Sequence, residues 1–270
     1  MNSNRSRWRV AAKTWTRALQ ALTTALLLLA GFLASLPARA DLADTVVRLK
    51  PSVVLVGTYE ATDSPRFTFR GTGFVVGSGN LAVTNAHVLP EPGAAVAAGK
   101  QLMVRTWTAP NQWSERIAKQ VSVDRLHDLA VLSFEGPPVN PLKLSSGVPR
   151  EGSGVAFMGF PIGGALGFSH VTHRATISAL TSVALPAPTA ATLNSRNISQ
   201  LRAGAFNLMQ LDGTAYPGNS GGPVFDIETG EVLGVVNMVL LKGTKESVLA
   251  QPSGISYAIP VEAVARLLNP

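Results

Sequence analysis

Short runs of β-branched and aromatic residues alternate with turn-forming residues along most of the chain from residue 52 onward. Many such runs in succession predict β-strands joined by turns, and therefore an all-β sandwich or barrel. The runs that we interpret as strands are residues 52–58, 67–70, 73–76, 81–84, 102–106, 120–123, 129–133, 154–158, 171–177, 206–210, 223–225, 231–238 and 256–259.

Apolar residues recur at helical spacing only near the two ends of this region. One short helix is expected before Pro51, which ends it, and a second after Pro260, which opens it. Their apolar faces are formed by Leu42, Val46 and Leu49 in the first helix and by Val261, Val264, Leu267 and Leu268 in the second. Between them, residues 135–141 are rich in turn formers and predict a linker between two β units, residues 41–140 and 141–270.

The first 40 residues have the three parts of a secretory signal peptide. A basic start is followed by an apolar run over residues 18–36 and by Ala38-Arg39-Ala40, with small residues at the expected cleavage site. We expect cleavage after Ala40, a periplasmic or secreted mature chain, and no stable membrane insertion after removal of the signal. An uncleaved anchor is the alternative, because the apolar run is just long enough to span a bilayer.

The charge of the chain is concentrated in this leader. The chain has 23 Lys and Arg against 16 Asp and Glu, but six of the basic residues lie within the first 40 positions, which contain no acid. The remainder is nearly neutral, which argues against a nucleic-acid-binding protein. The chain contains no cysteine, which excludes disulfides, thiol catalysis and cysteine-ligated zinc.

The segment Gly218-Asn219-Ser220-Gly221-Gly222 is the first candidate for chemistry. Glycines around a serine allow the backbone to turn tightly, which suits an exposed nucleophile beside free N–H donors. A plain hairpin turn is the alternative for this segment alone. The segment also matches the Gly-x-Ser-x-Gly pattern of α/β-hydrolases, in which the histidine follows the serine. All four histidines of this chain precede Ser220, so that interpretation fails.

A serine activated by histidine needs a base and a carboxylate elsewhere in the chain. His87 is the best base, because it follows an apolar strand in the sequence Thr-Asn-Ala-His-Val-Leu. Asp128 opens the apolar strand that follows it and is the candidate carboxylate, with Asp124 as the competitor. The pair His170 and His173 has metal-ligand spacing, but no third ligand lies nearby in the sequence, and we expect no metal site.

Taken together, these motifs resemble the chymotrypsin-like serine peptidases, and most closely the HtrA (Deg) branch. The matching segments, in the chain order His, Asp, Ser, lie at residues 84–88, 127–132 and 218–222. Further matches are Pro-Ser-Val-Val at 51–54, Gly-Thr-Gly-Phe at 71–74 and Gly-Ile-Ser-Tyr-Ala-Ile-Pro at 254–260. The resemblance covers nearly all of residues 41–270.

The resemblance implies two six-stranded antiparallel β-barrels that together form one protease domain. His87 and Asp128 would come from the first barrel and Ser220 from the second, and the N–H groups of Gly218 and Ser220 would form the oxyanion hole. No cofactor is implied, and an oligomer is compatible with the sequence. HtrA proteases usually carry PDZ domains after the protease domain; only about ten residues follow the last predicted strand here, so we expect none.

The expected function is a serine endopeptidase that hydrolyses unfolded polypeptides through an acyl-enzyme. By resemblance, Thr214 forms the floor of the S1 pocket and Asn237, Met238 and Val239 form the strand that pairs with substrate. A neutral floor predicts cleavage after Ala, Val or Leu, unless Asp212 turns toward the pocket. The alternative function is a catalytically silent peptide-binding or chaperone-like module on the same fold.

Overall fold

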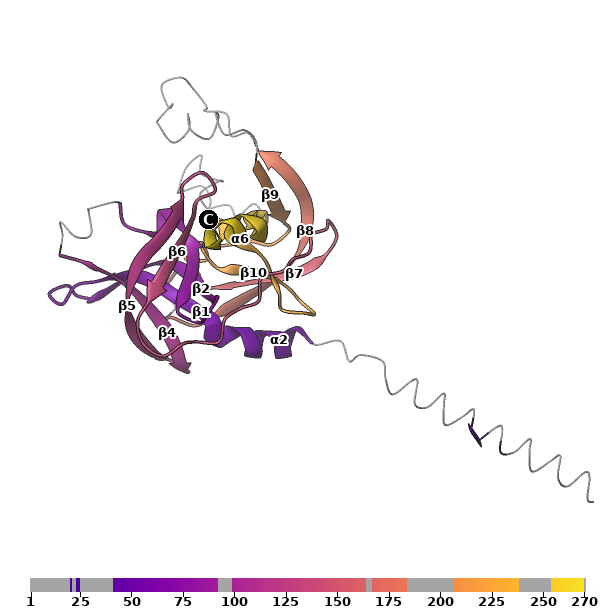
Figure 1. Cartoon of the computed structure of the whole chain (residues 1–270), viewed down its shortest axis with the longest axis horizontal. Helices are drawn as coiled ribbons and strands as arrows, with labels where there is room; N and C mark the ends of the chain where they lie inside the picture. Colours follow the sequence, from indigo (N-terminus) through magenta and orange to yellow (C-terminus); the bar gives the residue numbers. More distant parts are fainter. Residues whose placement is uncertain are drawn as a thin grey trace, which may run out of the picture. The chain divides into compact units, whose positions relative to one another are not determined.

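Twelve antiparallel strands form two closed barrels of six strands each in the computed structural model (Figure 1). The structure describes residues 20, 23–24, 41–91, 99–163, 167–183, 206–237 and 254–269. The predicted signal peptide lies almost wholly outside the described residues. In the part that is described, no helix is both long enough and apolar enough to cross a membrane.

The first barrel closes because β1 pairs with both β2 and β4. The strand order around it is β1-β2-β3-β6-β5-β4. Its strands are β1 (Val53–Tyr59), β2 (Phe67–Val76), β3 (Leu81–Asn85), β4 (Gln101–Ala109), β5 (Gln112–Asp124) and β6 (Leu129–Phe134).

The second barrel closes in the same way, because β7 pairs with both β8 and β10. The strand order around it is β10-β11-β12-β9-β8-β7. Its strands are β7 (Gly154–Gly159), β8 (Val171–Val183), β9 (Phe206–Leu211), β10 (Pro223–Asp226), β11 (Val232–Asn237) and β12 (Ser256–Pro260). These two barrels confirm the expected chymotrypsin-like architecture.

Each barrel has an apolar interior, and a further apolar cluster joins the two barrels. Leu55 and Phe74 of the first barrel belong to the same buried cluster as Met158 and Phe225 of the second. For this reason β1 is buried on both faces, with one face inside its own barrel and the other in the shared cluster. Burial of apolar surface from both barrels in one cluster holds the two barrels together.

Two short helices flank the barrels, as predicted. Helix α2 (Leu42–Leu49) precedes the first barrel, and helix α6 (Val261–Leu268) follows directly from β12. Figure 1 shows α6 between the strands of the two barrels, where it packs against β5 and β6 as well as β11. In the described segments, single-turn 3₁₀ helices occur at Lys50–Ser52 and Ala86–Val88.

The prediction of separate strands at residues 67–70 and 73–76 is wrong, because β2 is continuous from Phe67 to Val76. Gly71 and Gly73 suggested an interruption, since glycine weakens a strand. The structure gives the reason for Gly71: a Cβ atom there would lie 2.6 Å from Val88 Cγ2 and 3.0 Å from the Ser220 carbonyl oxygen. Strand β5 also begins at Gln112, well before the predicted start at residue 120.

Candidate active site

The candidate base and carboxylate are brought together by two adjacent strands. His87 lies in the 3₁₀ turn that follows β3, and Asp128 lies immediately before β6. Strands β3 and β6 are hydrogen-bonded neighbours, with Asn85 opposite Leu129. The Ala86 N–H donates to the Asp128 carbonyl oxygen at 3.0 Å, which joins the two turns where the strands end.

The His87 ring is held by the Asp128 carboxylate. His87 Nδ1 lies 2.5 Å from Asp128 Oδ2, and the His87 backbone N–H donates to Asp128 Oδ1 at 2.9 Å. Because a carboxylate can only accept, the ring carries its proton on Nδ1, which leaves Nε2 as the acceptor. Asp128 is buried, whereas 22% of the His87 side chain remains accessible. A partly accessible imidazole with Nε2 as its acceptor is suited to take up a proton as a general base.

A third donor to this carboxylate comes from the second barrel. Asn237, at the end of β11, donates from Nδ2 to Asp128 Oδ2 at 2.9 Å and is itself fully buried. From the sequence we expected Asn237 only in the strand that pairs with substrate. Its side chain also donates to the Asp128 carboxylate, a contact that the sequence did not predict. No local signal in the sequence indicates this contact, because residues 128 and 237 are far apart in the chain.

The competing carboxylate, Asp124, is engaged with a different histidine. Asp124 Oδ2 lies 2.5 Å from His127 Nδ1, and Asp124 Oδ1 accepts the N–H of His127 at 3.0 Å. Partial burial tends to raise the pKa of Asp124, but the hydrogen bonds from His127 and from the Leu126 N–H hold it below its ordinary value. Asp124 is therefore occupied away from His87.

Ser220 lies in the tight turn between β9 and β10, and the first barrel packs directly against this turn. The Thr72 N–H of β2 donates to the Ser220 carbonyl oxygen at 2.9 Å. A Cβ atom at Gly221 would lie 3.1 Å from Asn85 N, two residues before His87. Among the described residues no hydrogen bond joins the Ser220 hydroxyl to the His87 ring, as is common before substrate binds.

Two N–H groups of the serine turn, those of Gly218 and Ser220, donate to no group in the described part of the chain. The neighbouring N–H groups are engaged with backbone carbonyls: Asn219 with Tyr216 (2.9 Å) and Gly221 with Val236 (3.0 Å). Unpaired donors beside a serine are the arrangement that stabilises an oxyanion.

The orientation of the Gly218 N–H is set by the opposite end of the same peptide unit. The carbonyl of Pro217 accepts the N–H of Ile162 at 2.6 Å, so the Gly218 N–H points the other way. Gly218 has φ = 104°, a conformation that favours glycine. A Cβ atom at this position would also lie 2.2 Å from the Phe160 carbonyl oxygen.

The residues expected to form the S1 pocket are only partly described. Thr214 is half-buried, and the adjacent backbone is held by Ser256, whose hydroxyl donates to the Gly213 carbonyl at 2.5 Å and accepts the Ala215 N–H at 2.7 Å. Met238 and Val239 lie outside the described residues. Asp212 is exposed, and its carboxylate accepts the N–H of Thr176 on β8.

His170 and His173, the two histidines with metal-ligand spacing, each contact other groups of the protein. Within the described ranges, no group of three His, Cys, Asp or Glu side chains is placed to hold a metal ion. His170 donates from Nε2 to the Val53 carbonyl at 3.0 Å, and His173 stacks on Phe157 with ring centroids 4.8 Å apart. Burial lowers the pKa of both histidines.

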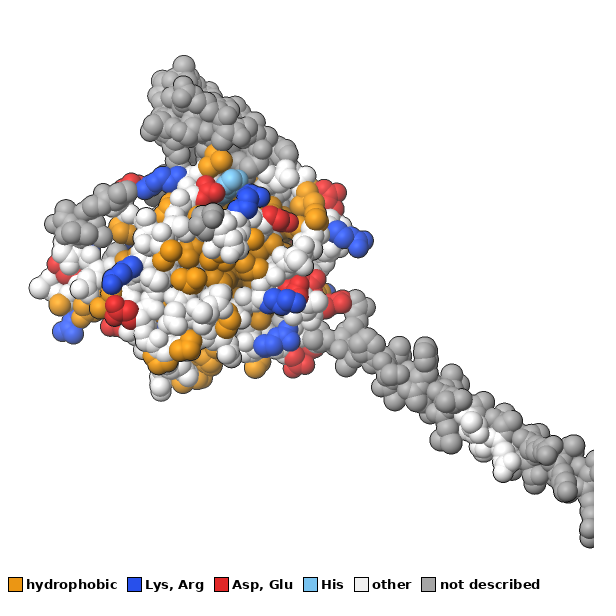
Figure 2. All heavy atoms as spheres, viewed as in Figure 1, with side chains coloured by type: hydrophobic (Ala, Val, Ile, Leu, Met, Phe, Trp, Pro, Cys, Tyr) orange, Lys and Arg blue, Asp and Glu red, His pale blue; other side chains and the backbone are white. Residues whose placement is uncertain are grey.

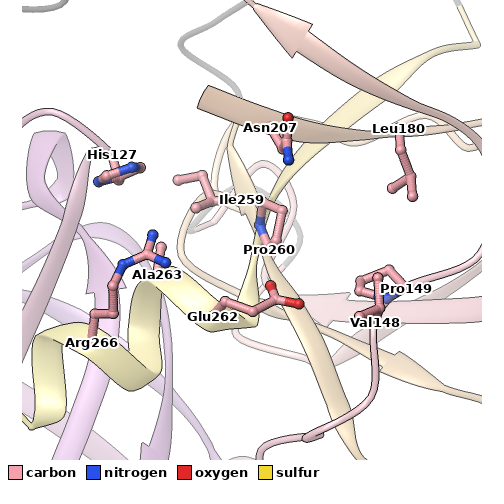
Figure 3. A pocket seen from close by; sticks show the side chains of 10 residues that line it. All are labelled: His127, Val148, Pro149, Leu180, Asn207, Ile259, Pro260, Glu262, Ala263 and Arg266. Atoms are coloured by element: carbon pink, nitrogen blue, oxygen red, sulfur yellow. The ribbon is translucent and has the colours of Figure 1, made fainter. Parts of the chain in front are cut away.

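A separate cavity of about 440 Å³ lies beside α6 and is lined by the side chains shown in Figure 3. Charged groups of α6, Glu262 and Arg266, face it together with His127 and with apolar side chains such as Leu180. None of His87, Asp128 and Ser220 lines it. His127 therefore faces a different part of the molecule from its neighbour Asp128, and this cavity is distinct from the candidate site.

The fold has two closed antiparallel barrels, with a His–Asp pair from one barrel and a glycine-flanked serine from the other. This arrangement defines the class of chymotrypsin-like serine endopeptidases. The sequence profile of the trypsin-like peptidase domain matches residues 71–235, more than half of the chain. The chain therefore belongs to the trypsin-like peptidase family.

Similar proteins support the resemblance to the HtrA branch. A probable periplasmic serine endoprotease DegP-like from Pseudomonas fluorescens is 26% identical over 200 residues, which cover 74% of this chain and 34% of the relative. The mitochondrial serine protease HTRA2 of Drosophila grimshawi is 27% identical over 238 residues, covering 84% of this chain and 46% of the relative. The chain thus spans about a third of the length of the DegP-like relative.

Among solved structures, the active form of the Rv3671c protease from M. tuberculosis superposes with a TM-score of 0.59. The match covers 83% of this chain and 82% of that chain at 24% identity. The inactive form of the same protease gives a TM-score of 0.57. At this level of identity the likeness establishes the fold alone.

Proposed function

We propose that this chain hydrolyses peptide bonds with Ser220 as nucleophile, His87 as base and Asp128 as the group that orients the base. Ser220 Oγ attacks the scissile carbonyl carbon while its proton passes to His87 Nε2. The same proton then goes to the leaving amine as the C–N bond breaks, and water hydrolyses the resulting acyl-enzyme. The observation that carries this proposal is the His87–Asp128 pair, 2.5 Å between Nδ1 and Oδ2.

The oxyanion of each tetrahedral intermediate would be bound by the N–H groups of Gly218 and Ser220. A single donor of this kind contributes roughly 3 to 4 kcal/mol to stabilisation of the transition state.

The mechanism requires no charge at Asn219, whose side chain is fully buried and uncharged. Because Asn219 has no charge to pair with a freed N-terminal amine, a chain that starts at any residue between 41 and 46 is expected to be equally active. Regulation would instead come from loop rearrangement near Gly159, Gly163 and Gly167; Gly164, which belongs to the same prediction, lies outside the described residues.

The proposed substrates are unfolded polypeptides in the periplasm or outside the cell. The predicted signal peptide supports this location, and the DegP-like relatives are named as periplasmic endoproteases. The neutral side chain of Thr214 and the attachment of Asp212 to β8 support an S1 pocket without a counter-charge for Lys or Arg. We propose cleavage after small or medium aliphatic residues.

Incubation of residues 41–270 with unfolded casein, followed by mass spectrometry of the products, tests activity and specificity together. Ser220→Ala is expected to abolish cleavage and labelling by a fluorophosphonate, whereas Ser178→Ala, at an exposed serine on β8, retains both. Undiminished cleavage by Ser220→Ala would refute the assignment of the nucleophile. A wild-type chain that binds peptide but never labels would be a binding module instead.

A further inference from the structure

Thr72 connects the first barrel to the serine turn through both its backbone and its side chain. It is fully buried in the middle of β2. Its N–H donates to the Ser220 carbonyl at 2.9 Å, and its Oγ1 lies 2.6 Å from the Gly218 carbonyl oxygen and 3.2 Å from the Phe160 nitrogen. A single side chain of the first barrel thus contacts two segments of the second.

The chemistry of these partners determines the direction of both hydrogen bonds. A carbonyl oxygen only accepts, so the Thr72 hydroxyl donates its one hydrogen to Gly218. A backbone N–H only donates, so the same hydroxyl accepts from Phe160. Phe160 begins the segment in which the Ile162 N–H holds the Pro217 carbonyl. The hydroxyl therefore joins the two segments that orient the Gly218 N–H.

Gly218 needs such a restraint because glycine has few steric limits of its own. Its φ of 104° is one of several conformations that glycine adopts at similar cost. A rotation of the backbone at Gly218 would turn its N–H away from the oxyanion position. A rotation that also moves the Gly218 carbonyl, which belongs to the next peptide unit, would leave the Thr72 hydroxyl without its acceptor in a fully buried place, which costs free energy.

We propose that Thr72 is a positioning residue of the oxyanion hole. Its hydroxyl acts through the Gly218 carbonyl to keep the Gly218 N–H directed at the developing oxyanion, without itself touching substrate. This inference rests on the proposed function, in which Ser220 is the nucleophile. It adds a hydroxyl group from the opposite barrel to the groups on which the rate of the chemical step depends.

Two variants separate the hydroxyl from the methyl group of Thr72. Thr72→Val removes the hydroxyl and keeps the shape, whereas Thr72→Ser removes the methyl group and keeps the hydroxyl. Thr106→Val is the matched control, because Thr106 is also a buried strand residue of the first barrel and its hydroxyl accepts a hydrogen bond from Arg116 Nε at 2.9 Å. The enzymes are compared after titration of active sites, so that partial unfolding does not affect the constants.

The measurements are kcat and KM for a peptide substrate and Ki for a peptide aldehyde, whose adduct places an oxygen in the oxyanion hole. Loss of one oxyanion donor lowers kcat by about 10² to 10³, and we expect Thr72→Val to lower kcat by about 10² with KM changed less than about threefold. Ki for the aldehyde rises in parallel, since it follows stabilisation of the transition state. Thr72→Ser and Thr106→Val stay within about threefold of the wild type.

Equal kcat values for Thr72→Val and Thr106→Val would overturn the inference. An equal loss of kcat in Thr72→Ser and Thr72→Val would overturn it too, because the effect would then come from packing of the methyl group. If Thr72→Val does not fold, Thr72→Ala carries the same expectation, because it also lacks the hydroxyl. A wild-type chain without activity would refute the proposed function itself. An active wild type with an unimpaired Thr72→Val would refute this inference alone.

Discussion

The Asp128 carboxylate receives its hydrogen bonds from donors on both barrels. The ring and backbone of His87 belong to the first barrel and the Asn237 amide to the second. A buried carboxylate that accepts several hydrogen bonds is stabilised in its charged form and held in one orientation. The direction in which the His87 ring points therefore depends on how the second barrel sits against the first.

The amide of Asn237 offers a direct test of this dependence. Asn237→Leu keeps the approximate shape of the side chain but removes the donor to Asp128, so that one buried carboxylate oxygen loses a partner. A hydrogen bond to a charged group contributes about 1.5 to 3 kcal/mol, and we expect kcat/KM to fall by about tenfold or more. Steady-state kinetics on a peptide substrate measures the effect.

Asn237→Asp is the companion variant, because it places a like charge against Asp128 and is expected to lower kcat/KM further than Asn237→Leu. Thermal unfolding of both variants controls for loss of the folded state. An Asn237→Leu variant with wild-type kcat/KM would show that the amide has no part in orienting the base.

Each of the two helices α2 and α6 contacts the barrel to which it is not directly joined. Arg48 of α2, which precedes the first barrel, donates to the Thr229 carbonyl of the second barrel at 2.9 Å. Helix α6 follows the second barrel but packs against β5 and β6 of the first, and its Val264 is fully buried in the apolar cluster that joins the barrels. Each helix therefore stabilises the association of the barrels rather than only the barrel to which it is joined (Figure 1).

Truncation of Val264 is expected to destabilise the whole fold. Val264→Ala removes two buried methyl groups from the cluster shared by the barrels and lowers the free energy of unfolding by roughly 2 kcal/mol. Val47→Ala on α2 is the control, because Val47 is 74% exposed and its truncation changes the free energy by less than about 0.5 kcal/mol. Urea denaturation of both variants measures the difference, and equal midpoints would contradict the role assigned to α6.

At the scale of the whole molecule, His170 lies where the two barrels meet. It donates to the Val53 carbonyl of β1, stacks on Trp113 of β5 with centroids 5.4 Å apart, and contacts Phe160 of its own barrel. Burial, together with the nearby charge of Lys50, lowers the pKa of His170 to about 4. The interface therefore holds this imidazole in its neutral form at physiological pH.

The interface is accordingly expected to weaken in acid. Between the ordinary pKa of histidine, about 6.5, and the folded value of about 4, the unfolded chain binds a proton that the folded chain does not. The stability contributed by neutral His170 is thus present above about pH 6.5 and is lost as the pH falls toward 4. We expect a loss of roughly 2 kcal/mol from this residue, since part of the ring remains solvated.

His170→Phe keeps an aromatic ring but cannot titrate, and it serves as the reference. The free energy of unfolding of the wild type is expected to fall more steeply than that of His170→Phe when urea denaturation is followed from pH 7 to pH 4.5. Other titrating groups, including His173, are common to both proteins and cancel in the comparison. Parallel pH profiles would refute the assignment to His170.

On the face shown in Figure 2, Lys and Arg side chains lie among Asp and Glu side chains, so that neither sign of charge dominates this face. This distribution agrees with the near-neutral composition of the chain beyond the leader. A near-neutral surface accommodates polypeptides of varied charge, because it neither attracts nor repels one sign over long distances.

Local patterns in the sequence were sufficient for the strand-rich fold, the two end helices and the motifs around His87, Asp128 and Ser220. These features depend on the spacing of apolar residues, on turn formers and on short segments in which neighbouring residues act together. The same patterns wrongly divided β2, because a glycine is unfavourable in an isolated strand. Gly71 is accommodated there because Val88 and the Ser220 backbone approach it closely.

Contacts between distant segments were decided by the packing of one barrel against the other. Asn237 reaches Asp128 across 109 positions of the chain, and the Thr72 hydroxyl reaches Gly218 across 146. The engagement of Asp124 by His127 rather than His87 is likewise a matter of where each side chain points after folding. A linear pattern records residue types and spacing, but a hydrogen bond forms only when folding brings a donor and an acceptor to the same place in the correct orientation.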